Sequence, residues 1–396
     1  MRLLLSGDWH LGKIINQTSM LEEQAHALEQ LQTIITKERV DCLMVSGDIY
    51  DRAIPPKEAV ELFDRFVSTC VARGVQIILI AGNHDSQERL AFGRDILASG
   101  GLHIADKFRG QLEPLTLKDA HGLIDVTLIP FAPFQMIRAV YDDPDITTYH
   151  QAYKRMLKDY SINPDRRNVL MTHAFVRASH SSVDVSDSEK TLAIGGVEVV
   201  DAALFDAFDY VVLGHLHKPQ VVGKETCRYT GSLCKYSFSE ASHTKSVILL
   251  DLGPKGQLSQ SLIPLMPKRD FVILKDTFNA LLQDTDRIAK HKHDFIKIIV
   301  TDQEEISEPV PRLRQAFPHI MEFAYAERID TAFAESMMRP ALAEKLQSGK
   351  SQDFAAIFLD LFEDFAKQTA DLTLTDVMRR TLTETLETVL KAGRNP

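Results

Sequence analysis

Short apolar runs alternate with amphipathic stretches through the first quarter of the chain, and this alternation constrains the fold more than any other feature. Strands and helices are predicted in turn at 2–6, 17–39, 42–46, 57–73, 75–81 and 86–98. Strands that are joined through helices lie parallel, in a sheet that is buried on both faces. The fold class is therefore α/β.

The rest of the chain divides into further segments. A hairpin at 114–118 and 123–131 precedes predicted strands at 169–172, 210–213, 229–238 and 246–251. A Pro-containing stretch at 263–267 then separates these strands from a small α/β pattern of strands at 271–275 and 295–300 around a helical stretch at 280–290. We predict a main domain at 1–268, a small α/β domain at 269–340 and C-terminal helices at 341–396.

The C-terminal segment has one apolar helical stripe followed by a second helix. The stripe consists of Phe354, Ile357, Phe358, Leu361, Phe362 and Phe365. The second helix aligns Met378, Leu382, Leu386, Val389 and Leu390. Packing on the protein's own body and docking to a partner helix pair explain this helical hairpin equally well.

Composition limits the partners and the location. The 396 residues carry a net charge of -10, so any contact with DNA must be local. No run approaches the length of a membrane span, and the apolar stretch before Ser6 is too short for a signal peptide. The four cysteines show no metal-binding spacing, which is typical of reduced thiols. We expect a cytoplasmic protein with no membrane association.

Five polar clusters follow predicted strands at their C-terminal ends. They are Asp8-Trp9-His10, Gly47-Asp48-Ile49-Tyr50-Asp51, Gly82-Asn83-His84-Asp85, Thr172-His173 and Gly214-His215-Leu216-His217. In an open α/β sheet, ligands bind in the crevice beyond these strand ends. Each cluster alone is a weak signal, but five on the same rim predict a metal site.

The predicted ligands combine three side chains with oxygen donors and four imidazoles, without cysteine. They are Asp8, His10, Asp48, Asn83, His173, His215 and His217. Mixed oxygen and nitrogen donors suit Mn²⁺, Fe or Zn²⁺, and seven ligands suit two ions about 3.5–4 Å apart. Asp48 is the natural bridge, because one carboxylate can bind both ions. Two divalent ions and two aspartates leave a positive charge that a hydroxide and a phosphodiester would neutralise.

His84 lies between a predicted ligand and Asp85. We predict that His84 is the general acid that protonates the leaving alkoxide, with its proton supported by Asp85. The alternative is that His84 is itself a ligand and Asn83 is structural. Basic residues that follow the metal motifs would contact DNA phosphates without reading the base sequence; they are Lys13, Arg52, Lys57, Arg89, Arg177 and Lys218.

At these motifs the sequence resembles the calcineurin-like metallophosphoesterase superfamily, whose signatures D-x-H, G-D-x-x-D, G-N-H-D, H and G-H-x-H occur here in that order. Within it, the runs D-W-H-L-G-K at 8–13, G-D-I-Y-D-R at 47–52 and G-H-L-H-K-P-Q at 214–220 resemble the bacterial SbcD family, relatives of Mre11. The resemblance implies a four-layer αββα sandwich with a small capping domain and C-terminal helices. It implies one metal ion at Asp8, His10, Asp48 and His217, a second at Asp48, Asn83, His173 and His215, and a catalytic His84. Asp51 stands where archaeal and eukaryotic relatives have a histidine, so a role in substrate positioning does not transfer to it.

The resemblance also implies a function. It would be that of a Mn²⁺-dependent nuclease of DNA repair, recombination and replication, with 3′→5′ exonuclease activity on double-stranded ends and endonuclease activity on single strands and hairpins. The implied partner is an SbcC-like coiled-coil ATPase, in a heterotetramer with a homodimer of this chain. The chain has no G-x-x-x-x-G-K-[ST] phosphate loop, so ATP use would come from that partner.

Two other functions fit part of the pattern. A metallophosphoesterase acting on a small phosphodiester or a phosphoprotein would share the metal motifs. However, Ala53 replaces the final glycine of the phosphatase motif G-D-x-x-D-R-G, and G-N-H-D replaces G-N-H-E. A non-catalytic scaffold would have lost ligands, and none of the expected ligands is missing here.

Overall fold

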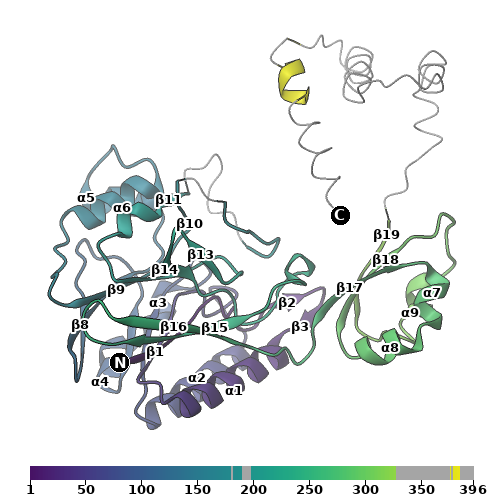
Figure 1. Cartoon of the computed structure of the whole chain (residues 1–396), viewed down its shortest axis with the longest axis horizontal. Coiled ribbons are helices and arrows are strands. Elements are labelled where there is room, and N and C mark those ends of the chain that lie inside the picture. Colours follow the sequence, from purple (N-terminus) through teal and green to yellow (C-terminus); the bar gives the residue numbers. More distant parts are fainter. Residues whose placement is uncertain (180–181, 190–197, 327–374, 376–377, 384–396) are drawn as a thin grey trace. The chain divides into compact units, whose positions relative to one another are not determined.

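A computed structural model describes residues 1–179, 182–189, 198–326, 375 and 378–383 (Figure 1). The chain divides into the units Met1–Ala326 and Glu327–Pro396. The predicted C-terminal helices at 341–396, with the whole apolar stripe, lie outside the described residues apart from 375 and 378–383. Among the helices that the structure describes, none has the length and apolar content that a membrane crossing requires.

Six strands form the first sheet, in the order β16-β15-β1-β4-β5-β6. Strands β1, β4, β5 and β6 run parallel, whereas β15 and β16 extend the sheet antiparallel from β1. The strands are β1 (Arg2–Ser6), β4 (Cys42–Val45), β5 (Gln76–Ile80), β6 (Leu102–Ala105), β15 (Ser246–Leu252) and β16 (Leu258–Pro264). Helices α1 (Leu21–Glu38) and α2 (Lys57–Ala72) pack on its outer face, on the lower side in Figure 1.

Six further strands form the second sheet, in the order β13-β14-β12-β9-β8-β7. They are β7 (Leu115–Asp119), β8 (Gly122–Ile129), β9 (Arg167–His173), β12 (Tyr210–Gly214), β13 (Gln220–Val222) and β14 (Lys224–Tyr229). Its outer face packs against α6 (Tyr149–Lys158), with α5 (Phe134–Tyr141) beside it. The short elements on this side are β10 (Val176–Arg177), β11 (Val200–Asp201) and η1 (Ala202–Phe205), whereas η2 (Phe238–Glu240) packs against Phe271 and Phe295.

The two sheets pack face to face through apolar side chains. Leu3 and Ile78 of the first sheet share one buried cluster with Val169, Met171 and Val212 of the second. Burying one such side chain contributes about 1.5–3 kcal/mol to folding. Helices outside both sheets complete the order helix, sheet, sheet, helix, which is the predicted αββα sandwich.

An ion-pair cluster closes the end of the sandwich where β1 and β9 begin. The guanidinium of Arg167 lies 2.9 Å from Asp119 Oδ2, and the Met1 ammonium lies 2.7 Å from the same atom. The Arg167 side chain is 4% exposed. This cluster ties both sheets together at the end opposite to the polar motifs.

Two predicted helices differ from the structure at turns that need a positive φ. The helix predicted at 17–39 begins only at Leu21, because Asn16 and Gln17 (φ 47° and 66°) turn the chain between β2 (Ile14–Ile15) and β3 (Thr18–Ser19). The helix predicted at 86–98 is two short helices, α3 (Gln87–Leu90) and α4 (Arg94–Ser99). Gly93 separates them with a φ of +68°, a conformation that ends a helix.

The strand predicted at 229–238 is wrong. Strand β14 ends at Tyr229, and Gly231 has a φ of +74°. A Cβ on Gly231 would lie 2.6 Å from Pro219, so the chain leaves the sheet at this close contact. The segment that follows crosses instead to the rim where the polar motifs lie.

A small parallel sheet of order β17-β18-β19 follows the sandwich. Its elements are β17 (Phe271–Asp276), α7 (Phe278–Gln283), α8 (Thr285–His291), β18 (Phe295–Val300), α9 (Pro309–Leu313) and β19 (Ile320–Tyr325). The predicted boundary at 268/269 stays a prediction, because both parts belong to the unit Met1–Ala326.

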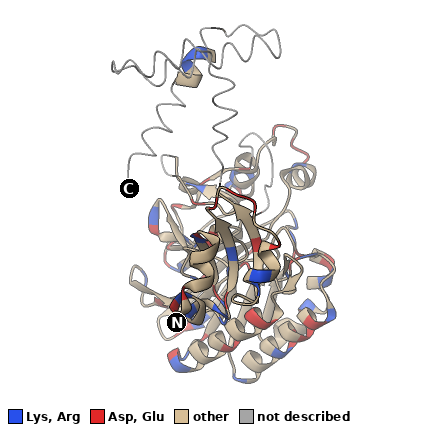
Figure 2. Cartoon of the chain, turned by 90° about the vertical axis from the view of Figure 1, so that its right-hand side faces the viewer, with Lys and Arg blue, Asp and Glu red and all other residues tan. Residues whose placement is uncertain are grey.

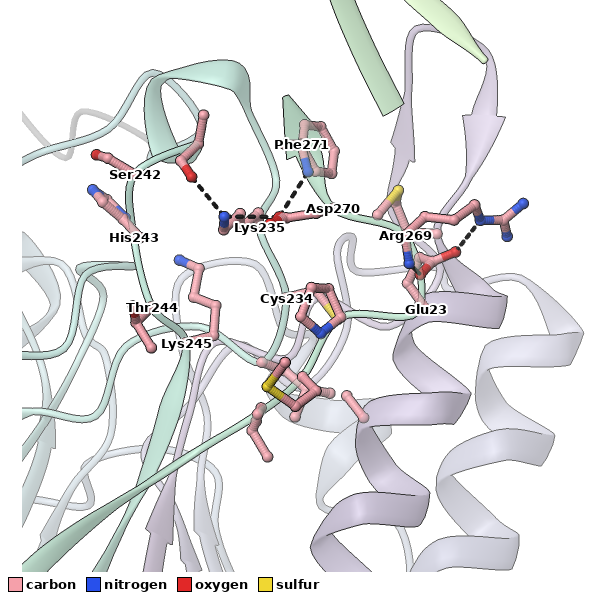
Figure 3. Close-up of a pocket in the computed structure, with 17 residues that line it drawn as sticks. Glu23, Cys234, Lys235, Ser242, His243, Thr244, Lys245, Arg269, Asp270 and Phe271 are labelled. Atoms are coloured by element: carbon pink, nitrogen blue, oxygen red, sulfur yellow. Dashed lines mark hydrogen bonds and ion pairs between the residues drawn. The ribbon is translucent and has the colours of Figure 1, made fainter. Parts of the chain in front are cut away.

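Ion pairs hold the start of the small sheet against the sandwich. Arg269 pairs with Glu23 of α1, and Lys235 lies 2.7 Å from Asp270 (Figure 3). Between these contacts is a pocket of about 390 Å³. These ion pairs therefore link residues that precede the predicted boundary at 268/269 to residues that follow it.

Candidate metal centre

The two sheets bring the five polar motifs to one rim. Asp8 and His10 follow β1, Asp48 follows β4, and Asn83 follows β5 in the first sheet. His173 ends β9 of the second sheet, and His215 and His217 follow β12. All seven predicted ligands are therefore brought together, from segments more than two hundred positions apart in the chain.

The backbone at this rim is strained at the predicted ligands themselves. Asp8, His10 and Asp48 have φ values of 49°, 46° and 49°, and His215 has 108°. A non-glycine residue in such a conformation costs about 1–3 kcal/mol, and such residues gather at functional sites. The strain directs these side chains into the site at a cost in stability.

Two glycines allow the loops to approach each other closely. A Cβ on Gly82 would lie 2.1 Å from Asp48 Oδ1, and a Cβ on Gly214 would lie 1.9 Å from the Ser46 carbonyl oxygen. No side chain fits at either position. The glycines of the motifs therefore bring the ligand loops of the two sheets into contact.

Trp9 anchors the loop between Asp8 and His10. Its ring is fully buried, and Nε1 donates a hydrogen bond to Ser6 Oγ at 2.9 Å. The indole packs edge-on against Phe66 of α2, with ring centroids 5.3 Å apart. This contact ties the first ligand loop to the helix layer.

Asp48 lies between two groups of donors. Its Oδ2 is 3.6 Å from His10 Nε2 and 3.5 Å from His173 Nε2. The Nε2 atoms of His10 and His217 are 3.1 Å apart. Asn83 Oδ1 lies 2.9 Å from His173 Nε2 and 3.3 Å from His215 Nδ1. The geometry thus offers two adjacent donor groups that share one carboxylate.

Burial sets the protonation of this cluster. It lowers the pKa of His173 and of His217 to about 4, and it lowers the pKa of His10 and His215 well below the usual range. Four imidazoles are therefore neutral at pH 7, the form in which histidine binds metals. Burial and the Asp48 carboxylate raise the pKa of Asp8.

The residues present fit a pair of cations. Asp8 Oδ2 is buried without a hydrogen-bond partner among the described residues, and the Nε2 atoms of His10 and His217 face each other at 3.1 Å inside the cluster. Leaving such atoms unpaired is costly, and two buried carboxylates side by side repel each other. Divalent ions would satisfy the donors and neutralise the carboxylates.

His84 and Asp85 lie at the site but do not face each other. His84 Nδ1 is 2.7 Å from the Asp51 carbonyl oxygen, and the His84 backbone N–H donates to Asp48 Oδ1 at 2.9 Å. The ring of His84 meets that of His10 edge-on, with centroids 4.7 Å apart. The expected support of His84 by Asp85 is therefore wrong for this structure, where Asp51 supplies the acceptor.

Asp85 instead joins two segments of the backbone. It accepts hydrogen bonds from the backbone N–H groups of Ile49, Tyr50 and Gly82 at 3.1, 3.0 and 2.9 Å. These N–H groups hold it as an acceptor, although burial and Asp48 raise its pKa to about 6. Asp85 thus fixes the loops after β4 and β5 in register.

Sequence reasoning missed the polar residues behind His217. Glu240 and Ser188 both reach His217 Nδ1, and Glu189 Oε1 accepts the His217 backbone N–H at 2.6 Å. Tyr236 packs edge-on against His10 and His217. None of these residues belongs to a motif with fixed spacing, so the sequence carried no signal for them.

The predicted DNA-contacting residues form two groups. Lys13, Lys57 and Lys218 pair with Asp51, Glu61 and Asp184 of this chain. Arg52, Arg89 and Arg177 are exposed, and Arg177 is paired with Asp201 in the β10–β11 ladder. In the view of Figure 2, the backbone positions of basic and acidic residues are interspersed along the ribbon.

Residues 1–219 match the family model described as calcineurin-like phosphoesterase, which is more than half of the chain. This is the class of protein that the double sheet and the clustered donors define. Residues 267–370 match a second model, described as the type 5 capsule protein repressor C-terminal domain.

Comparison with curated proteins narrows the class. The SbcD component of the SbcCD nuclease of Staphylococcus epidermidis is 32% identical over 81% of this chain and 84% of its own length. The corresponding protein from Staphylococcus saprophyticus is 31% identical over the same shares. The chain belongs to the SbcD family of calcineurin-like phosphoesterases. Among solved structures, a dimetal phosphatase from Danio rerio is 11% identical, with a TM-score of 0.40 over 67% of this chain and 97% of its own, a score that carries no conclusion.

Proposed function

We propose that the chain is the metal-dependent nuclease component of a DNA end- and hairpin-processing complex. The observation that carries the proposal is the cluster of seven donors, in which Asp48 is shared between two groups. Membership of the SbcD family gives the substrate class. The expected reaction is hydrolysis of DNA phosphodiesters, as a 3′→5′ exonuclease on double-stranded DNA and an endonuclease on single strands and hairpins.

The donors suit two divalent ions, and Mn²⁺ is the ion that the family resemblance implies. One would be held by Asp8, His10, Asp48 and His217, and the other by Asp48, Asn83, His173 and His215. The set contains no thiolate, so it differs from a structural zinc site, and its mixed oxygen and nitrogen donors suit Mn²⁺. When bound, two such ions generate a nucleophile from water near neutral pH and stabilise the charge on the reacting phosphate.

His84 acts as the general acid in this proposal. The Asp51 carbonyl can only accept, so His84 Nδ1 carries a proton and donates it in that hydrogen bond. The leaving alkoxide takes its proton from Nε2 of the doubly protonated ring, which returns to the neutral form with its remaining proton on Nδ1. The aspartate side chain next to it in sequence takes no part in this transfer.

The exposed arginines give a route to DNA affinity without sequence specificity. Arg52 follows the Asp48 motif, and Arg89 follows the Asn83 motif, so both lie close in sequence to the proposed ligands. Arginine contacts with backbone phosphates make binding depend steeply on salt.

The proposed partners follow the family. An SbcC-like coiled-coil ATPase would supply ATP use, since this chain has no phosphate loop. A homodimer of this chain would form a heterotetramer with it. Apolar side chains on α2, on α4 and just before α4 support the dimer, because no described residue covers them: Val60, Phe92, Ile96 and Leu97. We also propose a cytoplasmic location for this activity.

Metal analysis combined with two labelled DNA substrates tests the proposal. The full chain, loaded with Mn²⁺, should contain close to two ions and degrade both a blunt duplex and a hairpin. A phosphopeptide and a small phosphodiester serve as the competing substrates. Faster turnover of either competitor would indicate another phosphoesterase activity, and a chain that binds no Mn²⁺ would overturn the proposal.

A further inference from the structure

The two nitrogens of His217 face different surroundings. Nε2 points into the donor cluster, 3.1 Å from His10 Nε2. Nδ1 points away from it, 2.7 Å from Ser188 Oγ and 3.2 Å from Glu240 Oε1. The side chain therefore links the proposed metal centre to a polar group behind it.

The hydrogen bonds behind His217 fix its tautomer. Ser188 Oγ also contacts Glu240 Oε1, and a carboxylate accepts but does not donate. The single hydroxyl proton of Ser188 is therefore given to Glu240, and the hydroxyl oxygen accepts from His217 Nδ1–H. With its proton on Nδ1, the imidazole presents the Nε2 lone pair to the donor cluster.

Glu240 is held in place from its other side. It is 0% exposed, and its Oε2 lies 2.6 Å from Lys245 Nζ. The same ammonium donates to the His217 carbonyl oxygen at 2.7 Å. Figure 3 shows Lys245 beside the pocket, on the segment that leads into β15. Glu240 and Lys245 thus hold the side chain and the backbone of His217 in place.

A buried ion pair needs a reason beyond stability. Desolvating two charges offsets most of their attraction, and apolar replacements of similar volume are often as stable. Here the Lys245 ammonium lies against one oxygen of Glu240, and His217 Nδ1 lies against the other, so Glu240 faces the histidine as a carboxylate. A permanently charged acceptor behind a metal-binding histidine raises the basicity of the ligand and fixes its orientation.

We propose that Glu240, together with Ser188 and Lys245, is a positioning residue that orients His217 as a metal ligand. The inference rests on the proposed metal-dependent function. It assigns Glu240 to the proposed ion that Asp8 and His10 would also bind. The ion near His173 would not depend on Glu240, because Nδ1 of His173 is held by the Ser46 carbonyl oxygen at 2.8 Å.

Mn²⁺ titration of the full chain by calorimetry tests this role. Glu240→Gln should weaken one of the two Mn²⁺ sites about 10–100-fold and leave the other unchanged. Ser188→Ala should cause a smaller loss, because Glu240 still reaches Nδ1. Glu225→Gln is the matched control, since Glu225 is an exposed glutamate in an ion pair with Arg228.

Glu240→Gln leaves Lys245 buried without its counter-charge, so the variant could fail to fold. The double variant Glu240→Gln/Lys245→Met removes both charges and should fold while still weakening one site. As a second measurement, ¹⁵N NMR of the metal-free chain should show His217 with its proton on Nδ1. The triple variant Ser188→Ala/Glu240→Gln/Lys245→Met should lose this preference for the Nδ1–H tautomer.

The outcomes separate the two proposals. If the wild-type chain binds no Mn²⁺, the proposed function fails. If it binds two ions and the folded double variant binds both with wild-type affinity, the positioning role of Glu240 fails while the proposed function stands. Weakening of both sites by the same factor would also overturn the assignment to one ion.

Discussion

Neighbouring residues can have separate tasks at this site, as His84 and Asp85 show. His84 points its ring toward His10, whereas Asp85 binds backbone N–H groups of two loops. The order of residues in the motif gave both positions but not the direction of either side chain. Their substitutions should therefore have different effects.

His84→Gln should abolish most DNA hydrolysis and leave metal binding intact. The glutamine can still donate to the Asp51 carbonyl oxygen but cannot give a proton to a leaving group. We expect a loss of at least about 100-fold in kcat, the usual contribution of general acid catalysis. Single-turnover cleavage of a hairpin, together with Mn²⁺ titration, measures both properties. His121→Gln in the exposed hairpin turn is the control, and wild-type cleavage by His84→Gln would contradict the assignment.

Asp85→Asn should act through stability. The variant loses the anionic acceptor of three buried N–H groups, and we expect the free energy of unfolding to fall by about 2–3 kcal/mol. Urea unfolding in a chelator measures this without a metal contribution. If Asp85 acted only by supporting the His84 proton, stability would be unchanged and only the pH dependence of cleavage would shift.

The sequence predicted the proposed metal ligands but not the residues that hydrogen-bond to them. All seven proposed ligands were predictable, because each belongs to a short motif that follows a buried strand. Glu240 was not, since its link to His217 depends on how the chain folds back after Gly231. Contacts of that kind have no fixed spacing in sequence.

Elements with two buried faces were predicted to within about a residue. Strands β1, β4 and β12 have short apolar runs at their centres, and their ends agree closely with the structure. Irregular elements were harder, because one residue with a positive φ decides them, as at Gly93 and Gly231. The pairing of β15 and β16 beside β1 depends on contacts across the whole sandwich, which no local pattern encodes.

Helix α4 carries the strongest sign of an intermolecular contact among the described elements. Phe92, just before it, is 86% exposed, and Ile96 within it is 79% exposed. Phe92→Glu should convert the proposed dimer into a monomer, with little effect on the stability of the chain itself. Sedimentation velocity measures the change. Leu262→Glu on β16, at a position that is 49% exposed, is the control. Equal sedimentation of wild type and Phe92→Glu would contradict a dimer through this surface.

On the scale of the whole molecule, the sandwich has two different ends. One end gathers strained loops and unpaired donors, and the other gathers paired charges around Arg167. Strain at the functional end must be offset elsewhere, because native proteins are only marginally stable. The Arg167 cluster is a candidate for that compensation.

Asp119→Asn tests this compensation. Hydrogen bonds from Arg167, with the Met1 ammonium, hold the pKa of Asp119 below its usual range. A carboxyl with a lowered pKa stabilises the fold above its unfolded pKa of about 4 and loses that contribution as the pH falls further. We expect Asp119→Asn to lose about 2–3 kcal/mol at pH 7, with a difference from wild type that narrows only below about pH 4.

Urea unfolding across this pH range measures the effect. Asp251→Asn is the matched control, because Asp251 is 45% exposed in its ion pair with Arg2 and should lose less than about 1 kcal/mol. Equal losses in the two variants would show that burial of the Arg167 cluster brings no additional stability.

The buried ring of Trp9 gives the molecule an optical probe of its own. It is the single tryptophan of the chain, and its two neighbours in sequence are Asp8 and His10. All indole fluorescence of the protein therefore originates beside the first proposed ligand loop. Its emission will report the binding and release of cations in solution without an added dye. A partner protein that lacks tryptophan would not interfere with this signal.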